Sequence, residues 1–398
     1  MSKTIRNKYF SISEISRLYS SRVLTAIAGS ITSGFSTVYL YKQGYTLFQI
    51  IFIEMVFCII MILSCFVSVF LISRFGPKHT VLYSNIIQIP AMVLLSFVPN
   101  LGMLGIMFWI ILIGIASPLY SISQGVVFSK IKNDNTVGRQ IAILGILERV
   151  AIGAGPIIGG LIALFFGPKV IMLASAGIYL IAAMPLLRTA EPTTVRLKTN
   201  FIGLPWATAI HGIIAQSGIG FGNVSSGIAW SMFIVITIFP ITGNSIYLTL
   251  GALSSLAFVV AVVATYIFGK IIDKKNGGKL LKYCTVIWGL AHLSRPFIKT
   301  PSAVVGVNIV NEMASTGVAM TNTRGVVDIA DKSGHRIEYT SLINAFSCIG
   351  GTLACICLLI TITLIGDING LKLFFIIAAP FSFIAGTSKF RVYNKLIP

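Results

Sequence analysis

The chain has 398 residues, of which 56% are hydrophobic and only 10% are charged. Soluble domains carry about 25% charged residues, so this composition excludes an ordinary soluble protein and indicates a protein embedded in a membrane. The net charge of +19 is typical of nucleic-acid-binding proteins when it is concentrated on one surface. Here the basic residues are distributed along the whole chain between apolar segments, so we expect no nucleic-acid partner.

Apolar segments long enough to cross a bilayer occur along the whole chain. A span requires about 20 predominantly apolar residues. The N-terminus is polar and leads directly into the first span, so we expect this span to be retained and not cleaved as a leader. The seventh span begins with a glycine-rich stretch that suits an interfacial position. The sequence predicts twelve spans, at residues 17–41, 45–72, 79–98, 101–129, 139–166, 168–187, 211–241, 244–272, 280–298, 302–324, 337–365 and 369–388.

The basic residues indicate how these spans are oriented. An even number of spans places both termini on one side of the membrane. With that side cytoplasmic, all but six of the 30 Lys and Arg residues fall at cytoplasmic ends and loops, as the positive-inside rule requires. Arg149 lies within a span, and the remaining exceptions are on the outer side: Lys42, Lys169, Arg295, Lys299 and Lys372. We expect a plasma (bacterial inner) membrane protein with both termini in the cytoplasm.

Two sequence patterns recur at an interval of half the chain length. SQGVVFSKIKNDNTVGR at 123–139 corresponds to TRGVVDIADKSGHR at 323–336, and SVFLISRFGPKHTVL at 68–82 to IFGKIIDKKNGGKLL at 267–281. Such a repeat predicts two similar bundles of six helices. We expect an N-terminal bundle over 1–187, a polar cytoplasmic linker over 188–210 and a C-terminal bundle over 211–398.

These features resemble the major facilitator superfamily. The second half carries its cytoplasmic-loop signature from Gly269 through Asp273 to Lys279, with one residue inserted. The first-half copy keeps the segment from Arg74 to Lys78, but Val69 and Ser73 replace its glycine and acid. The resemblance implies an all-α membrane protein with twelve helices in two pseudo-symmetric bundles, working as a secondary transporter by alternating access.

Two further motifs bear on the direction and coupling of transport. The fifth span contains Gly155-Pro156-Ile-Ile-Gly159-Gly160, which is similar to the motif that the family associates with exporters. In the fourth span Gln124-Gly125 is present, but Ser121 stands where the family often has an arginine linked to proton coupling. The resemblance therefore implies efflux, while Ser121 argues against a simple proton antiport.

The signature residues also suggest a cytoplasmic gate. Asp273 ends one helix beside a glycine turn, and Arg336 begins the eleventh span on the same side. An ion pair between them would latch that side when the transporter opens outward. Arg139 is the first-half counterpart of Arg336, but Ser73 offers it no charge. The alternative is a solvated basic loop that serves topology only.

The fifth span combines small residues with a buried base. Gly153, Pro156 and Gly160 share a helix face, which predicts close helix packing between the halves. Arg149 lies ten residues, or about 15 Å, beyond Arg139 and hence near mid-membrane. An arginine there requires a partner, for which the candidates are Glu148, Glu54 and Glu312. Arg149 and its partner form either a structural ion pair or part of a coupling site.

Four spans carry polar faces that should point toward a central cavity rather than lipid. The family resemblance implies the same four spans, the first, fourth, seventh and tenth. The alternative is polar bonding between helices. The residues on these faces are Ala26, Ser30, Ser33 and Thr37; Ser117, Tyr120, Ser121 and Gln124; Asn223, Ser226, Trp230 and Phe233; and Asn308, Asn311, Glu312, Ser315 and Asn322.

Among these residues, Glu312 is the strongest candidate for a substrate-binding or coupling site, because it lies near the middle of its span. A carboxyl group there can exchange protons or balance a cationic substrate. Its alternative role is a salt bridge with Arg149 or Arg295. Glu54 is a weaker candidate for the same role.

The predicted cavity is neutral and polar with aromatic surfaces, which suits a small amphiphilic or uncharged solute. We find no nucleophile elbow, phosphate loop or zinc motif, and the six cysteines all fall in spans, so we expect no enzyme activity, cofactor, metal or disulfide. The expected function is export of a small organic compound, drug-like or metabolic, by a monomer with protons as the candidate coupling ion. The alternatives are a carrier or uniporter that takes up a sugar or nucleoside, and a non-transporting sensor.

Overall fold

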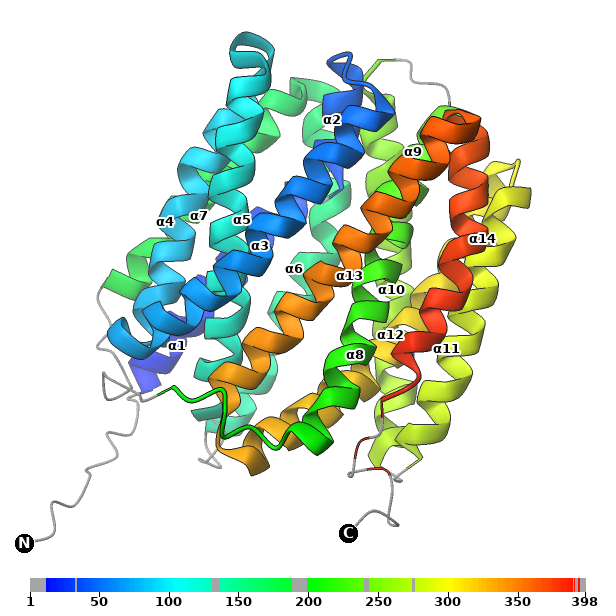
Figure 1. Ribbon diagram of the computed structural model, residues 1–398. Coiled ribbons are helices and arrows are strands. Elements are labelled where there is room, and N and C mark those ends of the chain that lie inside the picture. The colour runs from blue at the N-terminus through cyan, green and yellow to red at the C-terminus, as the bar shows by residue number, and fades with distance from the viewer. Residues whose placement is uncertain are drawn as a thin grey trace, which may run out of the picture.

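A computed structural model describes residues 12–32, 34–130, 137–187, 199–239, 243–273, 276–388, 390 and 393. Within these ranges the chain is helical and contains no strand (Figure 1). The elements are α1 (Ile12–Thr32), α2 (Phe35–Lys42), α3 (Leu47–Phe75), α4 (Pro77–Ser96), α5 (Val98–Lys130), α6 (Val137–Phe166), α7 (Pro168–Leu187), α8 (Trp206–Val224), η1 (Ser225–Ala229), α9 (Trp230–Thr237), α10 (Ser245–Asp273), α11 (Gly277–Ser294), η2 (Arg295–Phe297), α12 (Pro301–Ser333), α13 (Arg336–Ile365) and α14 (Asp367–Ala385).

Every predicted span coincides with a helix or with a helix that is interrupted. The first span is split at Gly34, whose φ of 76° lies in the left-handed region that favours glycine. The seventh passes from α8 through the π-helical turn η1 into α9. Ten of the described segments are long and apolar enough to cross a membrane, and the seventh span, Ala209–Thr237, is one of them. The fold is therefore that of an all-α membrane protein.

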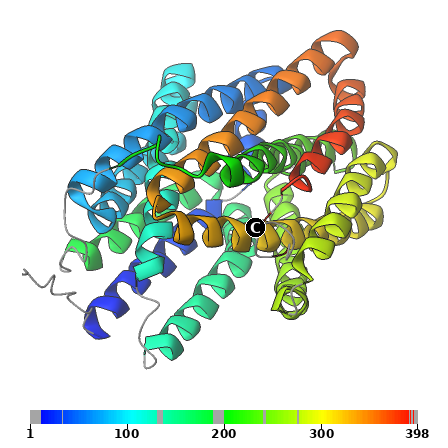
Figure 2. The ribbon, with the colours of Figure 1, turned by 60° about the horizontal axis from the view of Figure 1, so that its bottom comes forward.

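The helices form two bundles, α1–α7 and α8–α14. In the first, α4 packs on α5 and α7 while α1 packs on α6 and α7; in the second, α11 packs on α12 and α14 while α8 packs on α13 and α14. The bundles meet mainly where α3 packs on α13 and α6 on α10 (Figures 1 and 2). We call the end where α1 begins and α14 finishes the terminal end, and the opposite end the far end.

Glycines on two faces of α6 allow it to pack between α1 and α10. A Cβ atom at Gly160 would lie 2.7 Å from the carbonyl oxygen of Tyr247 on α10, and one at Gly153 would overlap the Phe258 ring. Gly155 and Gly159 instead approach the backbone of α1. Small residues permit such contacts where lipid provides no hydrophobic drive for association. The α6–α10 seam is thus a direct backbone contact between the two bundles.

Further contacts join the bundles at the far end. The Phe35 ring of α2 meets the Tyr247 ring edge-on with 5.8 Å between ring centroids. Lys42, at the end of α2, donates hydrogen bonds to the main-chain oxygen of Gly243 and to the side chain of Asn244. Together with the α6–α10 seam, these contacts join the two bundles at the far end.

Candidate functional site

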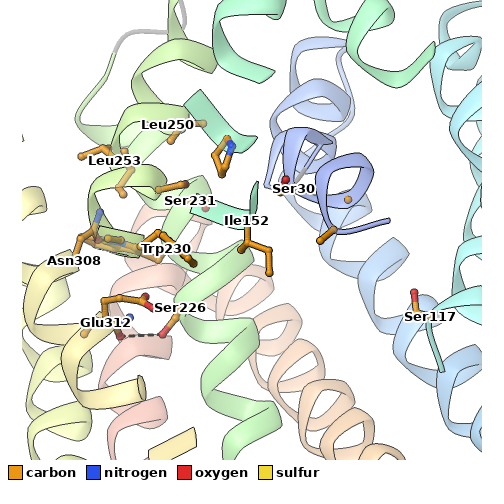
Figure 3. A pocket seen from close by; sticks show the side chains of 18 of the residues that line it. Ser30, Ser117, Ile152, Ser226, Trp230, Ser231, Leu250, Leu253, Asn308 and Glu312 are labelled. Carbon is orange, nitrogen blue, oxygen red and sulfur yellow. Dashed lines mark hydrogen bonds between the residues drawn. The ribbon is translucent and has the colours of Figure 1, made fainter. Parts of the chain in front are cut away.

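A cavity of about 590 Å³ lies between the two bundles. Figure 3 shows Ser226, Trp230, Asn308 and Glu312 on one wall and Ser30 and Ser117 on the facing wall. The residues that line it are Thr25, Ala26, Gly29 and Ser30 of α1; Gln88 of α4; Ser117 and Tyr120 of α5; Ile152 and Pro156 of α6; Tyr179 of α7; Ser226 of η1; Trp230, Ser231 and Ile234 of α9; Leu250, Leu253, Ser254, Ala257 and Phe258 of α10; and Asn308, Asn311 and Glu312 of α12.

The polar wall of the cavity is built from one face of α12 and from η1 with α9. The Trp230 indole nitrogen donates to Asn308 Oδ1 at 2.7 Å, and Ser226 Oγ donates to Asn311 Oδ1 at 3.1 Å. The π-helical turn carries Ser226 and brings it to α12. Turns of this kind often occur at functional sites, because they alter the direction of side chains within a helix.

Behind this wall lies Arg295, which is fully buried. Its Nη1 donates to the Ser225 carbonyl oxygen at 3.0 Å, and its Nη2 donates to Ser226 Oγ at 3.1 Å and to Asn311 Oδ1 at 2.9 Å. The guanidinium also lies 5.1 Å from the centre of the Trp230 ring. A charged group with no exposed surface must be satisfied in this way by hydrogen bonds and ring faces.

Arg295, which the charge distribution assigns to the outer side of the membrane, is therefore a buried residue and not a solvated one at a span end, while the side of the membrane on which it lies stays a prediction. The residue follows α11 in the short turn η2, which directs its side chain back into the bundle, where Arg295 Nη1 lies 2.7 Å from Nδ1 of the equally buried His292. Charge and hydropathy place a basic residue at a span end on the membrane surface. Neither pattern contains the information that neutral oxygen atoms of η1 and α12 are available to accept hydrogen bonds from Arg295.

Glu312 is half-buried and lines the cavity. It is the one carboxylic acid among the lining residues. Of the basic side chains that the structure describes, none forms an ion pair with it. The expected alternative of a salt bridge to Arg295 is thus not formed, and the one to Arg149, whose side chain lies outside the described residues, stays a prediction. The carboxyl group therefore borders the cavity without a basic partner among the described side chains.

Glu148 has a partner that the sequence did not predict. Its Oε1 accepts from Arg22 Nε at 2.7 Å, which links α6 to α1. Arg22 was assigned to a cytoplasmic end by the charge distribution, whereas it lies within α1 and is only 24% exposed at its side chain. The side chain of Arg149 lies outside the described residues, so its pairing stays a prediction.

The Arg22–Glu148 pair should contribute measurably to stability. Both side chains are mostly buried, so the Glu148→Gln and Arg22→Gln variants should show a coupling energy of about 1–2 kcal/mol in a double-mutant cycle. The measurement is thermal unfolding of the purified protein in detergent. The exposed Lys332–Asp328 pair, 2.9 Å apart with Lys332 67% exposed, is the matched control and should couple by less than about 0.5 kcal/mol. Equal coupling in both pairs would contradict the interpretation.

Several predicted site residues lie outside the cavity, and all of them are displaced toward the terminal end of the molecule. Ser121, Gln124, Asn223, Ser315 and Asn322 all lie nearer the terminal end than the lining residues of the same predicted span. Ser121 lies 3.2 Å from Asn344 Oδ1 of α13, and Asn322 donates to Gln216 Oε1 at 3.1 Å. Asn223 is exposed, and Ser315 binds the main chain of its own helix. Polar bonding between helices, the alternative interpretation, describes Ser121 and Asn322.

The other predicted candidates are dispersed. Glu54 lies on α3 and does not line the cavity, while Ser33 is outside the described residues. Among the gate residues, Arg336 Nη2 pairs with Asp331 Oδ1 at 2.9 Å, and Arg74 lies over the rings of Phe70 and Phe75. Gly269 is in α10 with open space around it. The side chains of Asp273 and Arg139 are outside the described residues, so the latch stays a prediction.

Sequence reasoning missed the wall that α10 contributes to the cavity. Its lining residues are mostly apolar, and the same pattern would suit a lipid-facing helix. Gln88 and Tyr179 were also missed, because only the first, fourth, seventh and tenth spans were expected to line the cavity. A signal was available on α4, where Gln88 lies one helical turn after Ser84 and donates to its Oγ at 3.3 Å. The adjacent serines Ser254 and Ser255 were the available signal in α10, since hydroxyls in an apolar span favour a protein-facing or cavity-facing position.

Comparisons with known proteins bear on this architecture. The family model described as the Major Facilitator Superfamily matches residues 18–354. A solved structure of a point variant of the nucleoside transporter NupG has a TM-score of 0.70, at 11% sequence identity, covering 94% of this chain and 98% of the other. No curated protein matches the sequence. The identity to NupG shows a shared fold alone, whereas the family model covers most of the chain. The chain therefore belongs to the major facilitator superfamily, a family of secondary transporters.

Proposed function

We propose that this protein exports a small organic solute, drug-like or metabolic, with Glu312 as the group that couples the movement to protons. The observation that carries the proposal is the cavity between the bundles, which is lined by three side-chain amides, an indole and one carboxyl group. Carriers of this kind bind their solute near the midplane at the interface between repeats. The Gly155–Gly160 motif of α6, with its close contacts to α1 and α10, favours export.

The arrangement of contacts supports alternating access. At the far end the bundles meet through α2 and through the α6–α10 seam. A carrier that is closed on one side of the solute site must open there while it closes elsewhere. We propose that the far end is the outer side and that the described conformation is the one closed to the outside.

The membrane orientation that accompanies this proposal is testable on the linker. The positive-inside rule places both termini and residues 188–200 in the cytoplasm, together with Arg188, Arg196 and Lys198. Trypsin should cleave the linker in inside-out vesicles and leave it intact in right-side-out vesicles, as judged by fragments of roughly half the chain length. The reverse pattern would contradict the orientation.

A second candidate function is uptake of a nucleoside or sugar. The solved structure with the same fold is named a nucleoside transporter. A flat ring beside hydrogen-bonding amides, as Trp230 lies beside Asn308, also suits a heterocyclic base or a sugar ring.

The test is flux in proteoliposomes that contain the purified full-length protein and a dye for lumenal pH. Labelled nucleosides, sugars and lipophilic cations are supplied with and without a pH gradient. Flux accompanied by a change in lumenal pH supports a proton-coupled carrier, and the sign of that change separates antiport from symport. Flux without such a change indicates a uniporter. Specific binding without flux for every compound would favour a sensor and contradict the proposal.

A further inference from the structure

The carbonyl oxygen of Asn311 is surrounded by hydrogen-bond donors. Ser226 Oγ lies 3.1 Å from it, Arg295 Nη2 2.9 Å and Trp288 Nε1 3.2 Å. Arginine and tryptophan side chains donate and have no acceptor. If the amide were turned over, its NH2 group would face two other N–H donors. The Asn311 side chain therefore has a single chemically acceptable orientation.

Asn308 is fixed in the same way by one donor. The Trp230 indole nitrogen, which can only donate, lies 2.7 Å from Asn308 Oδ1. Asn308 and Asn311 both line the cavity, and within the described residues neither amide nitrogen has a hydrogen-bond partner. The cavity is thus the place where these nitrogens can find an acceptor.

The consequence is a defined pattern of hydrogen-bonding groups along α12. Asn308 and Asn311 are three residues apart, which separates their Cβ atoms by about 5–6 Å on one face of the helix. The buried guanidinium of Arg295 polarises the Asn311 amide through its oxygen and so strengthens its N–H groups as donors. Glu312, the next residue, is an acceptor when ionised. The wall presents two donors and, beside them, one acceptor.

We propose that this wall selects a solute with two hydrogen-bond acceptors, such as hydroxyl or carbonyl oxygens or ring nitrogens, spaced by one helical turn. Arg295 is the positioning residue that fixes this preference through Asn311. Polyols, sugars and heterocyclic bases belong to the selected class, and lipophilic cations without acceptors do not. This inference rests on the proposed function, because it assumes that the solute binds in the cavity.

The test compares two classes of solute in wild-type protein and in Asn311→Asp. The substitution preserves side-chain size and an oxygen for Arg295, but it replaces the amide donor by a second oxygen. The probes are uridine, inosine and xylitol as acceptor-bearing solutes, and tetraphenylphosphonium and ethidium as cations without acceptors. Their affinities are measured by equilibrium dialysis and their flux in proteoliposomes. Asn369→Asp, at an exposed asparagine of α14, is the matched control.

We expect wild-type protein to bind at least one acceptor-bearing probe more tightly than either cation. Asn311→Asp should weaken that binding by about tenfold or more, because an acceptor of the solute then faces another acceptor. Undiminished binding of that probe by Asn311→Asp would overturn the inference. Flux of the cations alone in wild-type protein would overturn it too, while leaving the transport function in place. Absence of flux for both classes would contradict the proposed function and the inference with it.

A second pair of variants separates positioning from stability. Arg295→Met should lower the melting temperature. It should also reduce the ratio of affinities for acceptor-bearing over acceptor-free probes, because the side-chain amide of Asn311 can then rotate and exchange its oxygen and nitrogen. Arg295→Lys restores a donor and a positive charge and should recover part of that preference. A melting temperature that falls while the preference stays unchanged would show that Arg295 only supports the fold.

Discussion

The Glu312→Gln variant should lose solute accumulation driven by a pH gradient, down to the level measured without a gradient. Glutamine matches glutamate in size but cannot bind and release a proton. Glu312 is the one carboxylic acid among the residues that line the cavity, so the variant has no other carboxylate there that could bind the coupling proton. Exchange of labelled for unlabelled solute, which requires no net proton movement, should continue. Proteoliposome flux with the two protocols side by side gives the measurement.

Two further variants make this experiment decisive. Asp328→Asn, in an exposed ion pair with Lys332, is a control for loss of a carboxylate elsewhere and should behave as wild-type. Glu54→Gln tests the competing acid on α3, which lies away from the cavity. Loss of the gradient response in Glu54→Gln together with its retention in Glu312→Gln would transfer the coupling role to Glu54.

The Gly251→Ala variant should slow transport several-fold and lower the melting temperature. A Cβ atom at Gly251 of α10 would overlap the Pro156 carbonyl group of α6, so the two helices must separate to accommodate it. Overpacking of this kind costs about 1–3 kcal/mol, which exceeds the gain of up to about 1 kcal/mol that alanine brings to a helix. Separation of α6 from α10 also disfavours the conformation in which the far end is closed. Exchange flux and thermal unfolding report the two effects.

The matched control is Gly177→Ala in α7, where no heavy atom lies within 4 Å of the added Cβ. It should leave flux unchanged and keep or raise the melting temperature, because only the helix propensity changes. If Gly251→Ala transports and melts as this control does, the close contact between α6 and α10 has no role in closing the far end.

The sequence was sufficient to predict the helices and the polar wall on α12, because both depend on patterns within one segment. Apolar length gave the spans, and the spacing of Asn308, Asn311 and Glu312 predicted that they share one face, as they do in the cavity. The family and its fold were likewise predicted from motifs that a single segment contains.

The sequence was not sufficient for properties that depend on how deeply one helix packs against another. The predicted polar faces of the fourth, seventh and tenth spans extended beyond the cavity toward the terminal end, and that of the first span extended beyond it toward the far end, to Thr37. The pairing of Arg22 with Glu148 joins residues 126 positions apart, and no local pattern specifies it. The hydrogen-bond partners of Arg295 could not be predicted for the same reason, because Ser225 and Asn311 belong to two other segments of the chain.

The π-helical turn between α8 and α9 has a consequence for any comparison of this chain with its relatives. A π turn contains one more residue than an α turn, so the side chains after Ser225–Ala229 are rotated relative to an uninterrupted helix by about 100°, the angle of one residue. A relative with a regular helix here should align with a single-residue gap, and it would place a different side chain where Trp230 stands. Removing one residue from the turn should therefore exchange the ring that faces the solute without shortening the span.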